Sequence, residues 1–127
     1  MRVGITLPIF ERTALTALEA ARRAEEAGLD GVFVFDHLWP GSAKSRPALS
    51  MYPVLAAVAA TTSAIRIGSL VARVGLLPDR LISESFASLN ELSGHRLVAA
   101  LGDVDHALEH AARLPAGDAE AVVRPDR

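Results

Sequence analysis

The sequence predicts an α/β protein made of four consecutive β-strand–α-helix units whose strands run parallel. Short apolar runs alternate along the chain with longer segments rich in strong helix formers. One of these runs, residues 31–35, contains Gly, Val and Phe without helical spacing, which is typical of a strand buried on both faces. It leads directly into Asp36 and His37, and parallel strands present binding sites at their carboxyl ends. This alternation predicts right-handed crossovers between the strands.

The first unit has clear local boundaries. Residues 3–7 predict a strand that Pro8 closes, because proline cannot donate to a strand ladder. Thr13 can cap the helix predicted over residues 14–27. Gly28 is the expected left-handed stop of that helix, after which the chain turns into the second strand.

A long irregular stretch lies within the second unit, between its strand and its helix. Residues 38–52 contain several Pro, Gly and Ser residues without a period, which is typical of a functional loop. A short apolar helix is predicted over residues 53–61 and a third strand over residues 65–71. We expect a loop at residues 73–78 and a third helix over residues 79–92.

The fourth unit completes the predicted domain. It comprises a strand over residues 97–101 and a helix over residues 104–114. Residues 115–127 are rich in Pro, Gly, Ala and charged residues, which is typical of a flexible C-terminal tail. The sequence therefore predicts one α/β domain over residues 1–114, followed by this tail.

Composition excludes several classes of function. The 127 residues include no Cys, so disulfides, a thiolate nucleophile and a Cys metal site are excluded. A net charge of −2 gives no electrostatic reason to expect nucleic acid or an anionic membrane. No apolar run approaches the roughly 20 residues of a membrane-spanning helix, so we expect a cytoplasmic protein. His106 and His110 have a spacing compatible with metal binding, but no clear third ligand accompanies them, and we expect no metal site.

Four segments in order resemble the bacterial luciferase-like monooxygenase family, and more narrowly its branch that uses the deazaflavin coenzyme F420. The strongest is AEEAGLDGVFVFDH at residues 24–37. MRVGITLP at residues 1–8 resembles the opening strand of the family, and TSAIRIGSLV at residues 62–71 resembles its third strand. LNELSGHRLV at residues 89–98 resembles the run into its fourth strand. Each match is weak alone, but four in order with natural spacing are specific.

The resemblance implies part of a (β/α)8 barrel. Such barrels usually need about 250 residues, so the chain is similar to the N-terminal half of the family only. The family usually carries a glycine-rich turn after its fourth strand. Here Gly102 is followed by Asp103 and a predicted helix, which departs from that pattern.

The resemblance also implies roles for the residues that follow the second strand. It places Asp36 and His37 beside the ring of the cofactor, with His37 as the catalytic proton donor. An imidazole suits that role because it exchanges protons near neutral pH. Adjacent residues of a strand point to opposite sides, so one of the two is expected to face the barrel axis. The alternative from the residues alone is a turn acid beside a loop histidine.

The end of the third strand supplies the other implied cofactor contacts. In the family this segment forms a bulge with a non-proline cis peptide bond that presses on the cofactor ring. The resemblance implies such a bulge at Ser69, Leu70 and Val71, with the cis bond between Leu70 and Val71, and the alternative is an ordinary trans strand end. Arg73 could bind an anionic cofactor tail with a bidentate contact, and the alternative is a solvated loop arginine.

These expectations combine into two functional hypotheses. The first is an oxidoreductase that uses reduced coenzyme F420, or alternatively FMN, for hydride transfer or oxygenation of a small organic substrate. The second is a catalytically inactive, truncated half-barrel that acts as a scaffold or partner subunit. Four parallel strands cannot close a barrel of this type, and open strand edges invite pairing. We therefore expect a homo-oligomer or assembly with a complementary half-barrel chain.

Overall fold

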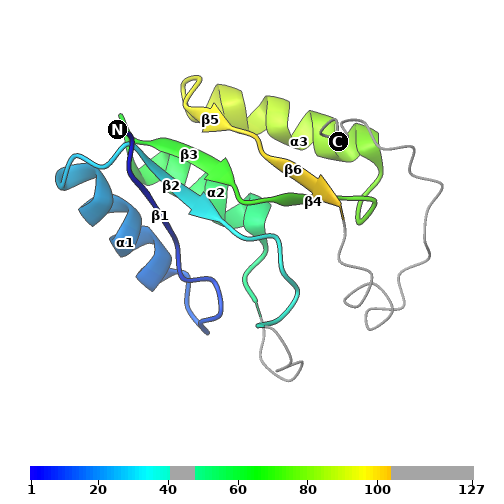
Figure 1. Cartoon of the computed structure of the whole chain (residues 1–127), viewed down its shortest axis with the longest axis horizontal. Helices are drawn as coiled ribbons and strands as arrows, with labels where there is room; N and C mark the ends of the chain where they lie inside the picture. Colours follow the sequence, from blue (N-terminus) through cyan, green and yellow to red (C-terminus); the bar gives the residue numbers. More distant parts are fainter. Residues whose placement is uncertain (41–47, 104–127) are drawn as a thin grey trace.

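The computed structural model describes residues 1–40 and 48–103, in which helices cover one face of a parallel sheet (Figure 1). In chain order the elements are β1 Gly4–Thr6, α1 Leu15–Glu26, β2 Gly31–Val34, α2 Met51–Thr61, β3 Arg66–Ser69, β4 Ala72–Val74, α3 Asp79–Leu92, β5 Leu97–Val98 and β6 Leu101–Asp103. The main sheet has the strand order β1-β2-β3-β5, and β4 pairs with β6. All pairings are parallel, so the predicted α/β architecture is confirmed.

The core lies between the sheet and the helices. Val32 of β2 and Ile67 of β3 are register partners, and both are fully buried on the helix side of the sheet. The buried face of α1 consists of small residues, which let the helix approach the sheet closely: Ala17, Ala21 and Ala24. Gly28 ends this segment with φ +73°, as predicted for a left-handed stop.

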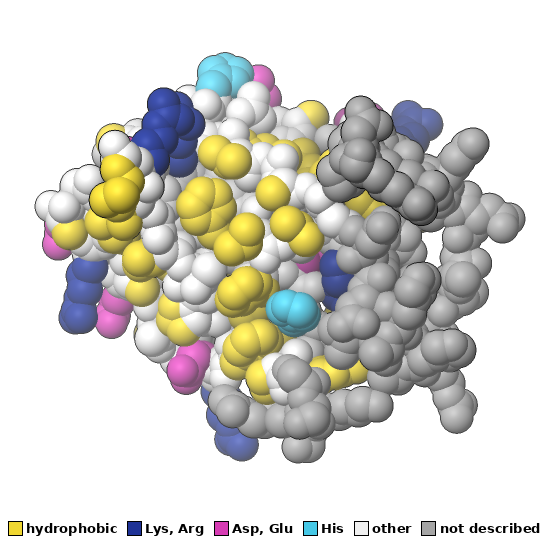
Figure 2. All heavy atoms as spheres, viewed as in Figure 1, with side chains coloured by type: hydrophobic (Ala, Val, Ile, Leu, Met, Phe, Trp, Pro, Cys, Tyr) yellow, Lys and Arg dark blue, Asp and Glu magenta, His cyan; other side chains and the backbone are white. Residues whose placement is uncertain are grey.

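A single aromatic ring covers much of the opposite face of the sheet. Phe33 alternates with Val32, so its side chain lies on the face that no described helix covers. A Cβ atom added at Gly4, Gly31 or Gly68 would lie 2.7, 3.0 or 3.0 Å from a Phe33 ring carbon. Three adjacent strands therefore use glycine where the ring lies against them. Figure 2 views this face and shows hydrophobic side chains gathered on it.

The predicted third and fourth strands are each divided in the structure. The strand predicted over residues 65–71 ends at Ser69 as β3, and a further strand, β4, begins at Ala72. A loop was expected over residues 73–78, but its first two residues belong to β4. The Ser69 hydroxyl explains the matching break between β5 and β6. Its Oγ accepts a hydrogen bond from Ala100 N at 2.9 Å and donates one to Ala100 O at 2.7 Å. A side chain therefore bridges the strands at this point, where Ala100 O also accepts the backbone N–H of Ala72 at 2.8 Å.

The second helix begins earlier than predicted. It starts at Met51, whereas the sequence favoured residues 53–61. Met51 is buried, which ties the first turn to the core. Pro53 falls within that first turn, where the missing N–H of proline removes no intrahelical hydrogen bond.

Two charged side chains fasten the connection between α2 and β3. Glu25 Oε1 accepts hydrogen bonds from the backbone N–H groups of residues 63–65 at 2.6–2.9 Å. The Arg96 guanidinium donates to oxygen atoms of residues on the same connection and beside it: Ala59, Thr62, Ile65 and Ser93. These bonds satisfy the backbone where the helix ends.

The last predicted elements cannot be compared with the fold. The helix over residues 104–114 and the tail over residues 115–127 lie outside the described residues, as do His106 and His110. In the part of the chain that the structure describes, no helix combines the length and the apolar character needed to cross a membrane.

Candidate functional site

Asp36 links the end of β2 to β4. It follows two residues after the last residue of β2, so its side chain projects from the carboxyl end of the sheet. Its Oδ2 accepts a hydrogen bond from the backbone N of Arg73 at 3.0 Å. The same oxygen lies 3.7 Å from Arg73 Nε. One carboxylate therefore binds the backbone of Arg73 and also lies beside its guanidinium.

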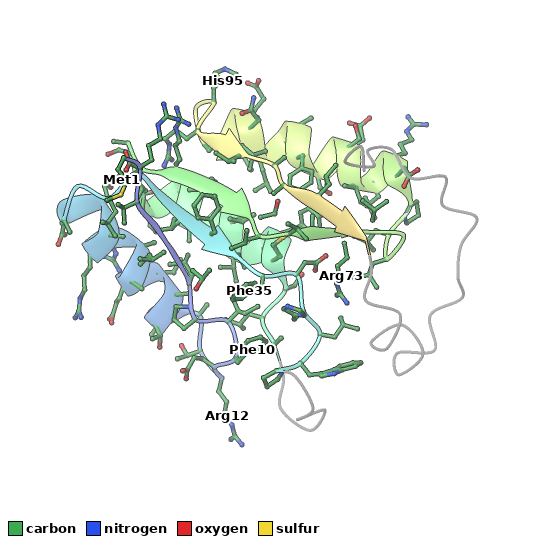
Figure 3. All side chains as sticks on the ribbon, viewed as in Figure 1. Met1, Phe10, Arg12, Phe35, Arg73 and His95 are labelled. Atoms are coloured by element: carbon green, nitrogen blue, oxygen red, sulfur yellow. The ribbon has the colours of Figure 1, made fainter. Side chains whose placement is uncertain are left out.

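Arg73 is a buried strand residue. It lies in β4, pairs in register with Gly102 of β6 and is 6% exposed. The alternative reading as a solvated loop arginine is therefore wrong, because a strand pairing not evident in the sequence encloses it. Among residues 1–40 and 48–103, no group forms a hydrogen bond with Nε or Nη2 of Arg73. Figure 3 shows the Arg73 side chain near the carboxyl end of the sheet.

The segment between β3 and β4 has the bulge that the resemblance implied. The peptide bond between Leu70 and Val71 is cis. Ser69 is fully buried and Leu70 is 44% exposed, so the chain carries a solvent-facing apolar side chain at this point. Val71 packs towards Gly102, where an added Cβ would lie 2.5 Å from Val71 Cγ2. Gly102 thus belongs to strand β6 and accommodates the bulge.

His37 lies among aromatic rings. Its ring centroid is 5.6 Å from that of Phe35 and 6.3 Å from that of Phe10 (Figure 3 labels both phenylalanines). The side chain is half-buried. Asp36 contacts Arg73 and His37 contacts the aromatic rings, so these adjacent residues have different surroundings, as expected beyond the end of a strand.

Tyr52 is a neighbour of Asp36 that the sequence did not assign to the site. Burial, and to a lesser extent the negative charge of Asp36, raise the pKa of the Tyr52 phenol above its ordinary value. Its ring lies 5.6 Å from that of Phe86. Tyr52 comes from α2 and Asp36 from the end of β2, so only the tertiary structure brings them together.

A cavity of about 230 Å³ lies elsewhere, on the helix side of β4 and β6. None of the residues predicted for the site lines it. Its lining is mostly apolar and consists of Val74, Asp79, Ile82, Ser83, Phe86 and Leu101. In the part of the chain that the structure describes, no group of three potential metal-ligating side chains occurs.

The structure therefore brings Asp36, Arg73 and the bulge together and places His37 one residue away. A family model described as luciferase-like monooxygenase matches residues 1–121. The chain belongs to the luciferase-like monooxygenase family. No curated protein matches it.

Solved structures share the fold of this family member. An F420-dependent secondary alcohol dehydrogenase, in complex with an F420-acetone adduct, has 24% identity, covers 80% of the chain and has a TM-score of 0.68. A coenzyme F420-dependent tetrahydromethanopterin reductase from Methanopyrus kandleri has 23% identity, covers 90% and has a TM-score of 0.76. The oxygenating constituent of 3,6-diketocamphane monooxygenase from Pseudomonas putida, in complex with FMN, has 15% identity, covers 95% and has a TM-score of 0.72.

The chain of this family member spans about a third of the length of these proteins. The matches cover 32%, 30% and 34% of the three solved chains. The parallel βα units are therefore those of a partial barrel.

Proposed function

We propose that the chain provides one wall of the cofactor site of a luciferase-like oxidoreductase. The observation that carries this proposal is the contact between Asp36 and Arg73 at the carboxyl end of the sheet, next to the exposed side chain of Leu70, in a member of this family. The exposed Leu70 side chain and the aromatic surroundings of His37 suit contact with a planar ring. Coenzyme F420 is the proposed cofactor, because of the resemblance at Asp36 and His37, and FMN is the alternative.

The proposed roles follow from the surroundings of each residue. The bound ring would supply hydride transfer or oxygen chemistry. Leu70 and Val71 would support one face of that ring, and Asp36 would hold the β4 backbone in place through Arg73 N. His37, held by Phe10 and Phe35, would donate or accept the proton. The substrate would be a small organic molecule.

Titration of the chain with oxidised F420 and with FMN tests this proposal. Binding is expected to perturb the visible absorbance of at least one ring. His37→Ala is expected to weaken that binding about tenfold, equivalent to about 1.4 kcal/mol. His95→Ala is the matched control, since His95 is exposed and lies at the other end of the sheet. The absence of a spectral change with both rings at high micromolar concentration would reject the proposal.

A second candidate is a non-catalytic half-barrel that assembles with a second copy or with a complementary chain. The edge strand β1 favours it, because all its residues are exposed. Ile5 is 37% exposed, whereas its register partner Val32 is fully buried. Pairing along β1 would cover this apolar side chain. Size-exclusion chromatography with light scattering tests assembly, and a monodisperse monomer would contradict it for a homo-oligomer.

A further inference from the structure

We propose that Arg73 binds an oxyanion, a phosphate or carboxylate group, on the side of the sheet that none of the described helices covers. This inference rests on the proposed function in that it assigns the anionic group bound at the same site. Its own basis is the position of the Arg73 side chain, its burial and its unused hydrogen-bond donors. None of these depends on the identity of a redox ring.

Strand alternation sets the direction of Arg73. Val74 lines the cavity on the helix side of β4 together with Ile82 and Phe86. Successive residues of a strand face opposite sides, so Arg73 faces away from α3. It therefore lies on the face of the sheet that carries the Phe33 ring.

The guanidinium is held in place but not saturated. Arg73 is 94% buried, since only 6% of it is exposed. Asp36 Oδ2 lies 3.7 Å from Nε, beyond hydrogen-bond distance, and already accepts the backbone N–H of Arg73. Within residues 1–40 and 48–103, neither Nε nor Nη2 has a hydrogen-bond partner. Buried polar groups are normally satisfied, so these donors indicate a ligand.

The shape of the guanidinium selects the ligand chemistry. Its N–H groups form a rigid planar fork that matches two oxygens of one phosphate or carboxylate. Asp36 fixes the arginine from one side, which lowers the loss of side-chain freedom when the anion binds. Two sources share this chemistry: the phosphate of a cofactor such as FMN, and an anionic group on a separate substrate.

Calorimetric titration with inorganic phosphate tests the inference, using the unmodified chain, Arg73→Gln and Arg66→Gln. Arg66 is the matched control, because it is exposed at the opposite end of the neighbouring strand β3. Arg73→Gln is expected to weaken phosphate binding at least tenfold, and Arg66→Gln to leave it unchanged. Should Arg73→Gln fail to fold, NMR of the unmodified chain replaces it. Phosphate is then expected to shift the Arg73 Nε–H resonance and not that of Arg66.

Parallel titrations with FMN and riboflavin identify the source of the anion, since the two share a ring and differ in the phosphate. A preference for FMN that Arg73→Gln abolishes supports a cofactor phosphate. A separate anionic substrate is supported if phosphate binding depends on Arg73 while the unmodified chain and Arg73→Gln bind FMN with equal affinity. If neither phosphate binding nor FMN binding depends on Arg73, the inference is overturned. The proposed function still holds in that case if the chain binds the ring of F420 or of FMN. Arg73-dependent phosphate binding without any ring binding preserves the inference alone.

Discussion

The carboxylate of Asp36 accepts the backbone N–H of Arg73 at 3.0 Å, which joins the end of β2 to β4 beyond the break in the third strand. Asp36 Oδ2 also lies 3.7 Å from Arg73 Nε. This contact holds the strand that follows the bulge against the neighbouring strand end. The geometry of the bulge therefore depends on a side chain from an earlier unit of the fold.

Replacing Asp36 tests this dependence. Asp36→Ala leaves the backbone N–H of Arg73 without its acceptor and removes the negative charge beside the buried guanidinium, and we expect it to lower the free energy of unfolding by about 2–4 kcal/mol. Urea denaturation measures the loss. Glu19→Ala, at an exposed position of α1, is the control and should change stability by less than about 0.5 kcal/mol. Equal losses in the two variants would contradict the structural role of Asp36.

Tyr52 provides a spectroscopic probe of the negative charge of Asp36. It is the only tyrosine in the chain, so phenolate absorbance reports it alone. Because burial and the Asp36 charge raise its pKa, deprotonation is expected above the usual value of about 10. Asp36→Asn should lower that pKa without restoring the usual value, since burial is the larger cause.

The same shift has a consequence for stability. The folded protein holds the Tyr52 proton more tightly than the unfolded chain does. Its contribution to stability is therefore complete below the unfolded pKa and is lost as pH rises through the folded pKa. A titration midpoint in the folded protein at or below that of the urea-unfolded chain would contradict the burial of Tyr52.

Glu25 is expected to give an acid-sensitive contribution to stability. Backbone hydrogen bonds from Ala64 and Ile65 lower its pKa. A lowered folded pKa contributes stability above the unfolded pKa, and this stability is lost as pH falls through the folded pKa. The difference in unfolding free energy between the unmodified chain and Glu25→Gln should therefore shrink as pH falls below about 4.

The neighbouring residue supplies the control for this comparison. Glu26 is exposed at the end of α1, and Glu26→Gln should leave both stability and its pH dependence nearly unchanged. Urea midpoints measured for the three proteins across the acid range give the comparison. A constant difference between Glu25→Gln and the unmodified chain at every pH would contradict the assigned role.

Gly68 is expected to tolerate no side chain. A Cβ atom there would overlap the Val98 carbonyl oxygen and lie 3.0 Å from the Phe33 ring. We expect Gly68→Ala to destabilise the protein by about 1–3 kcal/mol in thermal or urea unfolding. Phe33→Leu in the same chain should not rescue it, because the backbone contact with Val98 remains. Full rescue by Phe33→Leu would show that only the ring excludes the side chain.

The candidate site was predictable only in part. Asp36 and His37 come shortly after the end of the second strand. The resemblance located the cis bond between Leu70 and Val71, which the structure confirms. Arg73 was selected as a cofactor contact, but its burial was not foreseen. Burial arises from the pairing of β4 with β6, which lies far away in sequence. The proximity of Tyr52 to Asp36 was not predicted, because the two residues belong to different elements.

The sequence by itself determined the order of the βα units, the parallel sheet and the stop at Gly28, because these depend on local composition and periodicity. The tertiary structure alone decided where the third and fourth strands break. Ser69 inserts its hydroxyl between strands at Ala100, and Asp36 binds the backbone of Arg73. These are contacts between residues distant in the chain, and their strength depends on distance and burial that no local pattern encodes.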